Sequence, residues 1–138
     1  MAGVIVLDAS VLIALFDPAD AQHERAEALF LANAAEQFAL SSLTLTEFLI
    51  RPTAAGVAGA AEVFIANMGI VVSPLLAGDV RHLAQVRAES GLKLPDAVVL
   101  WLAQTSSASV MTLDERLAKA AASVGVDVAA LLPASPQN

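Results

Sequence analysis

The sequence contains no cysteine, which excludes both a disulfide framework and a thiolate zinc site. A reducing compartment is compatible with this absence. No apolar run approaches the ~20 residues that span a bilayer. No basic residue precedes Arg25, so the amino terminus lacks the positive flank of a secretory signal. We therefore expect a soluble, cytoplasmic protein with no membrane partner.

Basic residues are also scarce, with 7 Lys and Arg against 14 Asp and Glu and a net charge of −7. Because Lys and Arg supply most of the affinity for phosphates, this balance disfavours a nucleic-acid partner. Hydrophobic residues are abundant, at 57 % of 138 residues. This composition predicts one compact domain over 1–132, followed by a frayed, proline-containing tail over 133–138.

Short apolar segments alternate along the chain with longer segments of helical periodicity. We expect strands at 4–7, 38–40, 70–72, 109–111 and 126–129. We expect helices at 10–16, 20–33, 44–50, 57–67, 78–89, 95–104 and 112–124. This alternation predicts an α/β fold, with a parallel sheet of about four to five strands and helices on both faces.

Local signals suggest where several of these helices begin and end. Thr44 with Glu47, and Thr112 with Glu115, have the spacing of a capping box. Pro52 predicts that the first of these two helices stops just before it.

Four acidic residues stand where expected strands end or helices begin: Asp8, Glu47, Asp96 and Asp114. In an open parallel sheet, ligands bind beyond the carboxyl ends of the strands, so these four acids could converge at one edge. Crowded carboxylates repel one another unless a cation joins them. Hard divalent ions such as Mg²⁺ prefer oxygen ligands of this kind and promote phosphodiester hydrolysis. The pattern therefore favours a metal-binding hydrolytic site.

Three of the four acids also have an ordinary structural interpretation. Asp96 and Asp114 are stabilised by the dipole of the helix that each begins, and Glu47 would complete its capping box. Asp8 differs, because it interrupts an apolar run at a strand end, where burial without a partner is costly. A functional role is therefore the better interpretation of Asp8.

Other polar and aromatic residues leave alternatives open. Ser10 either caps its helix or supports a metal-bound water, while Thr112 is more typical of an N-cap. His23 and His82 have no acid or histidine partner at metal-ligand spacing, so we expect neither to be catalytic. Trp101, on an apolar helix, is more typical of a core or subunit contact than of a base-stacking platform.

Four segments, each carrying one of the four acids, together resemble the motifs of the PIN-domain family. They span 4–15, 44–49, 92–97 and 111–118, in the order of the family and over nearly the whole chain. The size and single-domain layout are most similar to the VapC-type toxins of bacterial toxin–antitoxin systems.

This resemblance implies a type II toxin that acts as an Mg²⁺- or Mn²⁺-dependent endoribonuclease on RNA. It also implies a homodimer held inactive by a small VapB-type antitoxin. The metal ligands would be Asp8, Glu47, Asp96 and Asp114, with Ser10 and Thr112 in support. Many members carry a further acid shortly after the fourth; here the nearest candidate, Glu115, either joins the site or caps its helix.

RNA binding by so acidic a chain needs a local source of positive charge. Bound divalent ions would offset part of the negative charge. Arg51, Lys93 and Arg116 are near the four acids in sequence, and we expect them to contact RNA. Two alternatives remain: a catalytically inactive PIN-like binding module, and a phospho-accepting signalling domain. The second is disfavoured because Asp8 has no acidic neighbour and no lysine follows Lys119.

Overall fold

The computed structural model describes residues 3–129, so the tail expected over 133–138 lies outside the described residues. The strands of the described chain are β1 (Val4–Leu7), β2 (Gln37–Ser41), β3 (Val71–Ser73) and β4 (Ser109–Met111). The helices are α1 (Ala9–Phe16), α2 (His23–Ala32), α3 (Ser42–Ala54), α4 (Ala58–Asn67), the 3-10 turn η1 (Ala77–Asp79), α5 (Val80–Ser90), α6 (Leu94–Thr105) and α7 (Glu115–Ser123). None of these helices is long and apolar enough to cross a membrane.

The strands form one parallel sheet in the order β3-β2-β1-β4. The chain runs outward from β1 to β2 and β3 on one side, and β4 then pairs with β1 on the other. The order therefore reverses beside β1, the position at which open parallel sheets bind ligands. Leu7, at the end of β1, is in register with Met111, at the end of β4, so the segments after both strands begin side by side.

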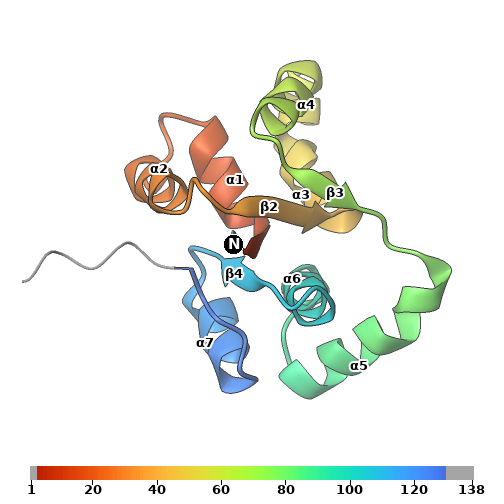
Figure 1. Cartoon of the computed structure of the whole chain (residues 1–138). Helices are drawn as coiled ribbons and strands as arrows, with labels where there is room; N and C mark the ends of the chain where they lie inside the picture. Colours follow the sequence, from red (N-terminus) through yellow and green to blue (C-terminus); the bar gives the residue numbers. More distant parts are fainter. Residues whose placement is uncertain (1–2, 130–138) are drawn as a thin grey trace, which may run out of the picture.

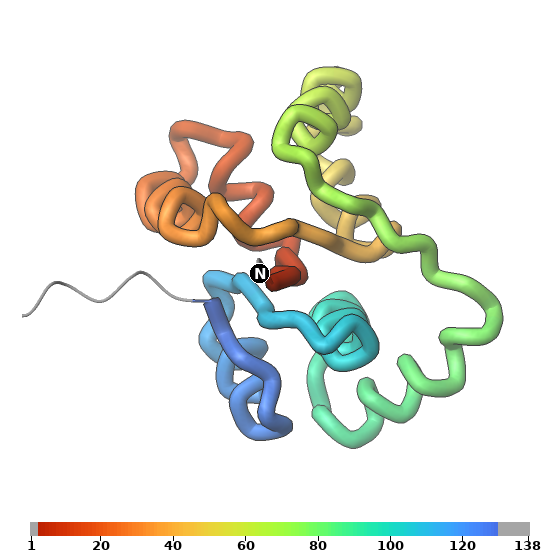
Figure 2. The backbone as a smooth tube through the Cα atoms, in the orientation of Figure 1, coloured from red at the N-terminus to blue at the C-terminus, as the bar shows by residue number. Residues whose placement is uncertain are grey.

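Helices cover both faces of the sheet, which confirms the predicted α/β class. Helices α1 to α4 lie on one side and α5 to α7 on the other (Figure 1). Figure 2 follows the chain as it passes from α4 through β3 to α5. Side chains of β1 alternate between the two layers: Ile5 and Leu7 join one core cluster and Val6 joins the other. Burial on both faces explains why this strand is apolar throughout.

Helix α3 extends further at its carboxyl end than the sequence predicts. It continues through Pro52, the residue that was expected to stop it. Proline removes one backbone donor and disfavours helix at the residue before it. Here the side chain of Pro52 is buried in the packed helix layer, which offsets this cost. The chain turns only at Gly56, whose left-handed φ of +77° suits glycine.

Neither expected capping box forms. Ser41 caps α3, because its Oγ accepts a hydrogen bond from the amide of Thr44 at 3.1 Å. Asp114 caps α7, with Oδ1 accepting from the amides of Arg116 and Leu117 at 2.8 and 3.4 Å. Each helix thus begins at a different polar residue from the one expected, and Glu47 has no part in the cap of α3.

The expected strand over 126–129 is reduced to a single bridge between Val110 and Val128. That prediction was wrong as to a full strand, since among residues 3–129 this segment forms a single bridge to β4. Trp101 is 5 % exposed and belongs to the core between α6 and its neighbours. The sequence left both a core position and a subunit contact open for Trp101, and the structure shows a core position.

Candidate active site

Asp8 is the centre of a hydrogen-bonded cluster at the carboxyl ends of β1 and β4. Its side chain is 4 % exposed, and its Oδ2 accepts hydrogen bonds from Ser10 Oγ and Thr112 Oγ1, both at 2.7 Å. Its backbone amide donates to the carbonyl of Met111 at 3.0 Å. A buried carboxylate is tolerated because these hydroxyl groups replace water. Within residues 3–129 both side-chain hydrogen bonds go to Oδ2, which leaves Oδ1 for another ligand.

The two hydroxyl groups also hold the loop that carries Asp114. Ser10 Oγ accepts from the amide of Leu113 at 3.2 Å, and Thr112 Oγ1 accepts from the amide of Asp114 at 2.9 Å. Each hydroxyl therefore bridges Asp8 to the backbone between β4 and α7. Neither residue caps a helix: both bind Asp8 and the loop that follows β4.

Replacing Thr112 by valine is expected to destabilise the fold by about 1–3 kcal/mol, because the buried carboxylate of Asp8 loses a donor and the half-buried amide of Asp114 loses its acceptor. Ser10→Ala should have a smaller effect in the same direction. The two changes share Asp8, so their double-mutant cycle should show coupling of about 0.5–3 kcal/mol. Urea unfolding measures both effects. Thr46→Val on exposed α3 surface is the matched control, and equal effects at 46 and 112 would contradict the bridging role.

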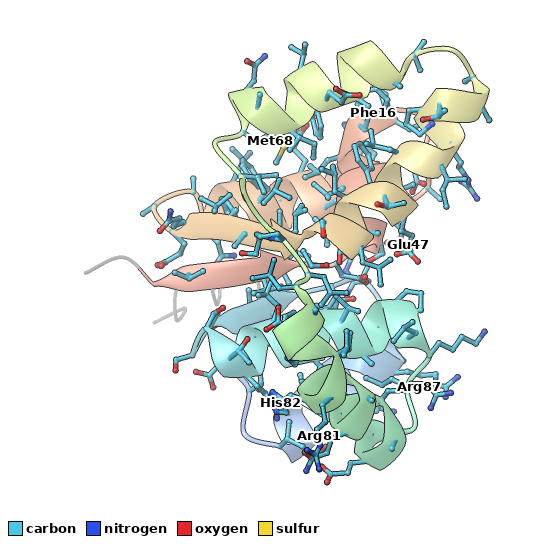
Figure 3. The ribbon with its side chains drawn as sticks, turned by 90° about the vertical axis from the view of Figure 1, so that its right-hand side faces the viewer. Phe16, Glu47, Met68, Arg81, His82 and Arg87 are labelled. Atoms are coloured by element: carbon cyan, nitrogen blue, oxygen red, sulfur yellow. The ribbon has the colours of Figure 1, made fainter. Side chains whose placement is uncertain are left out.

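The four acids line one open cleft of about 370 Å³. Its walls are formed by Asp8, Ala9, Ser10, Ile13, Glu47, Ile50, Arg51, Asp96 and Asp114. Figure 3 shows Glu47 on α3, on the side where α3 approaches α6. Asp96 is in the first turn of α6, and its carboxylate caps no backbone group. Four segments far apart in sequence thus present carboxylates to one space.

Crowding in the cleft is visible in the acid–base properties of two of the four acids. Burial raises the pKa of Glu47, and the negative charges of Asp8 and Asp96 raise it further. Burial also raises the pKa of Asp96, with added repulsion from Asp8 and Asp114. Arg116 and Lys93 act on Asp96 in the opposite direction. The cleft therefore resists full ionisation in the absence of a cation.

This crowding predicts a pH dependence of stability. With a raised pKa the folded chain keeps protons that the unfolded chain has released, so stability falls as pH rises from the ordinary carboxyl pKa through the raised one. In chelator, the unfolding free energy of Asp96→Asn relative to wild type should therefore increase from about pH 4 to about pH 7. Urea titrations at each pH measure it. Parallel curves for the two proteins would contradict the predicted repulsion.

The donor set of the cleft fits a hard divalent cation. Within residues 3–129 no three acidic or histidine side chains lie close enough together to form a metal cluster as they stand. Mg²⁺ does not require one, since it keeps several waters and binds through one or two carboxylates. The four acids supply only oxygen ligands and repel one another. Among residues 3–129, the side-chain hydrogen bonds of Asp8 go to Oδ2, which leaves Oδ1 to bind a cation. The residues present therefore fit such an ion.

The expected RNA-binding residues lie near the four acids, whereas Glu115 lies outside the cleft. Arg51 lines the cleft, and Lys93 and Arg116 are near enough to act on Asp96. Glu115 does not line the cleft; it is exposed at the start of α7 and lines an adjoining cavity. It does not cap α7 either, because Asp114 does.

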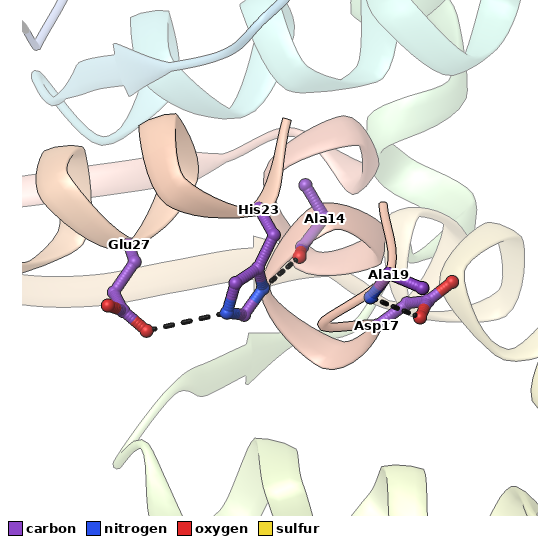
Figure 4. A network of polar contacts seen from close by, with 5 residues as sticks. All are labelled: Ala14, Asp17, Ala19, His23 and Glu27. Carbon is purple, nitrogen blue, oxygen red and sulfur yellow. Dashed lines mark hydrogen bonds and ion pairs between the residues drawn. The ribbon is translucent and has the colours of Figure 1, made fainter. Parts of the chain in front are cut away.

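His23 and His82 do not line the cleft. His23 Nδ1 is 2.7 Å from the carbonyl of Ala14, and its Nε2 is 3.5 Å from Glu27, so it joins α2 to α1 (Figure 4). His82 is exposed on α5, in the opposite layer from α3 (Figure 3).

Sequence analysis missed the apolar walls of the cleft. Ile13 and Ile50 both line it. Each follows a polar site residue, Ser10 or Glu47, by three positions on the same helix, and such residues share a helix face. Helical spacing from the four motifs would have indicated both.

A family model described as PIN domain matches residues 5–123. No sequence among curated proteins matches the chain.

Several solved structures share the fold. The Mycobacterium tuberculosis toxin VapC20, described as cleaving the sarcin–ricin loop, is 18 % identical, with a TM-score of 0.72 over 88 % of this chain and 95 % of that one. A toxin–antitoxin complex from Klebsiella pneumoniae is 20 % identical, with a TM-score of 0.69 over 93 % and 98 %. VapBC2 from Rickettsia felis, bound to promoter DNA, is 12 % identical, with a TM-score of 0.67 over 91 % and 96 %. At these identities the similarity is one of fold.

Proposed function

The chain belongs to the PIN-domain family, and from this premise we propose that it is the toxin of a type II toxin–antitoxin pair. Its activity would be that of a divalent-metal-dependent endoribonuclease, with Mg²⁺ as the natural ion and Mn²⁺ as a substitute. The observation that carries the proposal is the convergence of Asp8, Glu47, Asp96 and Asp114 on one cleft beside the point where the strand order reverses.

In this proposal the four acids hold the metal, which when bound would activate water and stabilise the charge that develops on the phosphodiester. Two hydroxyl groups fix Oδ2 of Asp8 and leave its Oδ1 for binding. Ser10 and Thr112 hold Asp8 and the Asp114 loop in a constant relation. Because the folded chain already holds these carboxylates in place, binding of the metal and the substrate would require little rearrangement of the site.

Positive side chains around the acids would bind the substrate. Arg51 lines the cleft, and Lys93 and Arg116 face Asp96 closely enough to act on its ionisation. None of the three forms an ion pair within the described residues 3–129. Cations that are not neutralised internally are available for phosphates, which supports a local RNA-binding patch on an acidic protein.

The proposal is tested by incubating the purified chain with total RNA in Mg²⁺, Mn²⁺ or chelator. We expect cleavage with either ion and none in chelator, because the acids alone supply no activated water. RNA fragments should carry the same ends in both metals. Cleavage that survives chelation would contradict the proposal, as would intact RNA under all conditions.

An antitoxin and a second copy of the chain are the proposed partners. Solved toxin–antitoxin complexes share this fold, which supports a small VapB-type protein as the inhibitor. The homodimer is proposed from the family resemblance. Expression of the chain should arrest bacterial growth, and Asp96→Asn should relieve the arrest. Equal toxicity of the two would favour a binding module without catalysis.

A further inference from the structure

We propose that a cavity between α2 and the start of α7 binds the RNA nucleotide next to the one that is cleaved, with Arg25 on its phosphate. This inference rests on the proposed function and adds to it a second substrate subsite. Neither Arg25 nor the cavity was part of the expected RNA-binding patch.

The cavity adjoins the acidic cleft. It has a volume of about 390 Å³ and is lined by Arg25, Leu29, Thr112, Leu113, Asp114, Glu115, Ala118, Val128 and Ala129. Asp114 lines the cleft as well, and Thr112 is hydrogen-bonded to Asp8 inside it. The loop between β4 and α7 is therefore a wall common to both spaces. A strand leaving the cleft across Asp114 would enter this cavity directly.

The lining suits a nucleotide. Leu29 is 5 % exposed, and Leu113, Ala118 and Val128 are half-buried, so one side of the cavity is an apolar surface for the face of a base. Its volume falls within the usual range of small-ligand pockets. Aliphatic and small side chains contact bases without selecting one by hydrogen bonds, so the subsite would hold the strand without reading its sequence.

Arg25 supplies the charge that a phosphate needs. It is exposed on α2 and forms no ion pair within residues 3–129, although Glu115 lines the same cavity. The guanidinium group matches phosphate oxygens in a two-pronged arrangement. The carboxylates of Asp114 and Glu115 repel an RNA strand as well, so they would confine its phosphates to the side of Arg25. RNA is the occupant that we propose because Asp114 lines both the cavity and the acidic cleft, which makes the two spaces continuous.

The experiment measures RNA affinity and cleavage separately. Arg25→Gln is placed in the Asp96→Asn background and compared with Arg81→Gln, which removes an exposed arginine from α5 in the opposite layer (Figure 3). Binding of a fluorescent, random-sequence, single-stranded RNA is followed by anisotropy at several salt concentrations. Arg25→Gln should weaken binding about tenfold and reduce the salt slope by about 0.7, the value for one phosphate contact. Arg81→Gln should change neither.

In the active chain, Arg25→Gln should raise KM with kcat unchanged, because the contact is the same in ground and transition states. A second variant, Ala118→Phe, fills the cavity and should lower RNA affinity comparably, with a thermal melt confirming the fold. If wild type cleaves RNA but Arg25→Gln and Ala118→Phe both bind RNA as tightly as Arg81→Gln does, the subsite is overturned and the proposed function stands. Wild type that neither binds nor cleaves RNA would overturn the proposed function as well. Loss of protein-partner binding with RNA affinity intact would assign the cavity to protein and overturn the subsite.

Discussion

Asp96→Asn is expected to lower the rate of RNA cleavage by at least about a hundredfold while the protein stays folded. Groups that only orient metal ligands cost about 10–100-fold when replaced, and a ligand itself should cost more. Asparagine keeps the shape of aspartate but removes the charge that would bind the cation. The carboxylate caps no backbone group in α6 and is repelled by Asp8 and Asp114, so its loss should not destabilise the metal-free fold.

The matched control is Asp127→Asn, which removes the same charge from an exposed residue beside the start of β4. Its cleavage rate should equal that of wild type. Initial rates on one RNA at saturating Mg²⁺, together with the melting temperature of each protein, distinguish a catalytic loss from unfolding. A folded Asp96→Asn protein that cleaves RNA at the wild-type rate would contradict the role of Asp96 in catalysis.

Phe48→Ala is expected to reduce the free energy of unfolding by about 3–5 kcal/mol, a large part of the stability of a domain of this size. Phe48 is 1 % exposed on the helix that carries Glu47. Its ring meets Phe16 edge-on, with centroids 5.7 Å apart and planes at 87°, and lies 6.3 Å from the ring of Phe64. Truncation leaves a cavity and removes these aromatic contacts. Because the change also loosens α3, cleavage should fall through misplacement of Glu47.

Equilibrium unfolding in urea measures this effect. Leu31→Ala is the comparison, since Leu31 is 66 % exposed and its removal should cost no more than about 0.5 kcal/mol. Similar losses at 31 and 48 would show that the packing of α3 against α1 and α4 contributes little to stability.

Much of the fold could be predicted because its signals are local. The run 4–7 is apolar throughout, as is typical of a strand buried on both faces, and Asp8 ends it. Spacing of apolar residues located α1, α2, α4, α5 and α6 to within a few residues. Helix ends were harder, because the capping residue and the tolerance of Pro52 depend on what packs against each turn.

The identity of the four acids was also set by the sequence, since only a few carboxylates follow strands or open helices. Their convergence required the strand order. With β4 paired beside β1, the segments that carry Asp8 and Asp114 become neighbours, and α3 and α6 bring Glu47 and Asp96 to the same cleft. A different order would have dispersed the same residues over the sheet edge.

What tertiary structure alone decided is how the site is held and how far it extends. Thr112 donates to an oxygen of Asp8 across 104 positions of sequence, a contact that no local pattern encodes. Arg25 reached the cavity beside Asp114 because α2 packs near the start of α7, although nothing in its own helix distinguishes it from a surface arginine. Sequence determines which groups can ionise and donate. Packing of distant segments determines which of them share a space, and so which can act together.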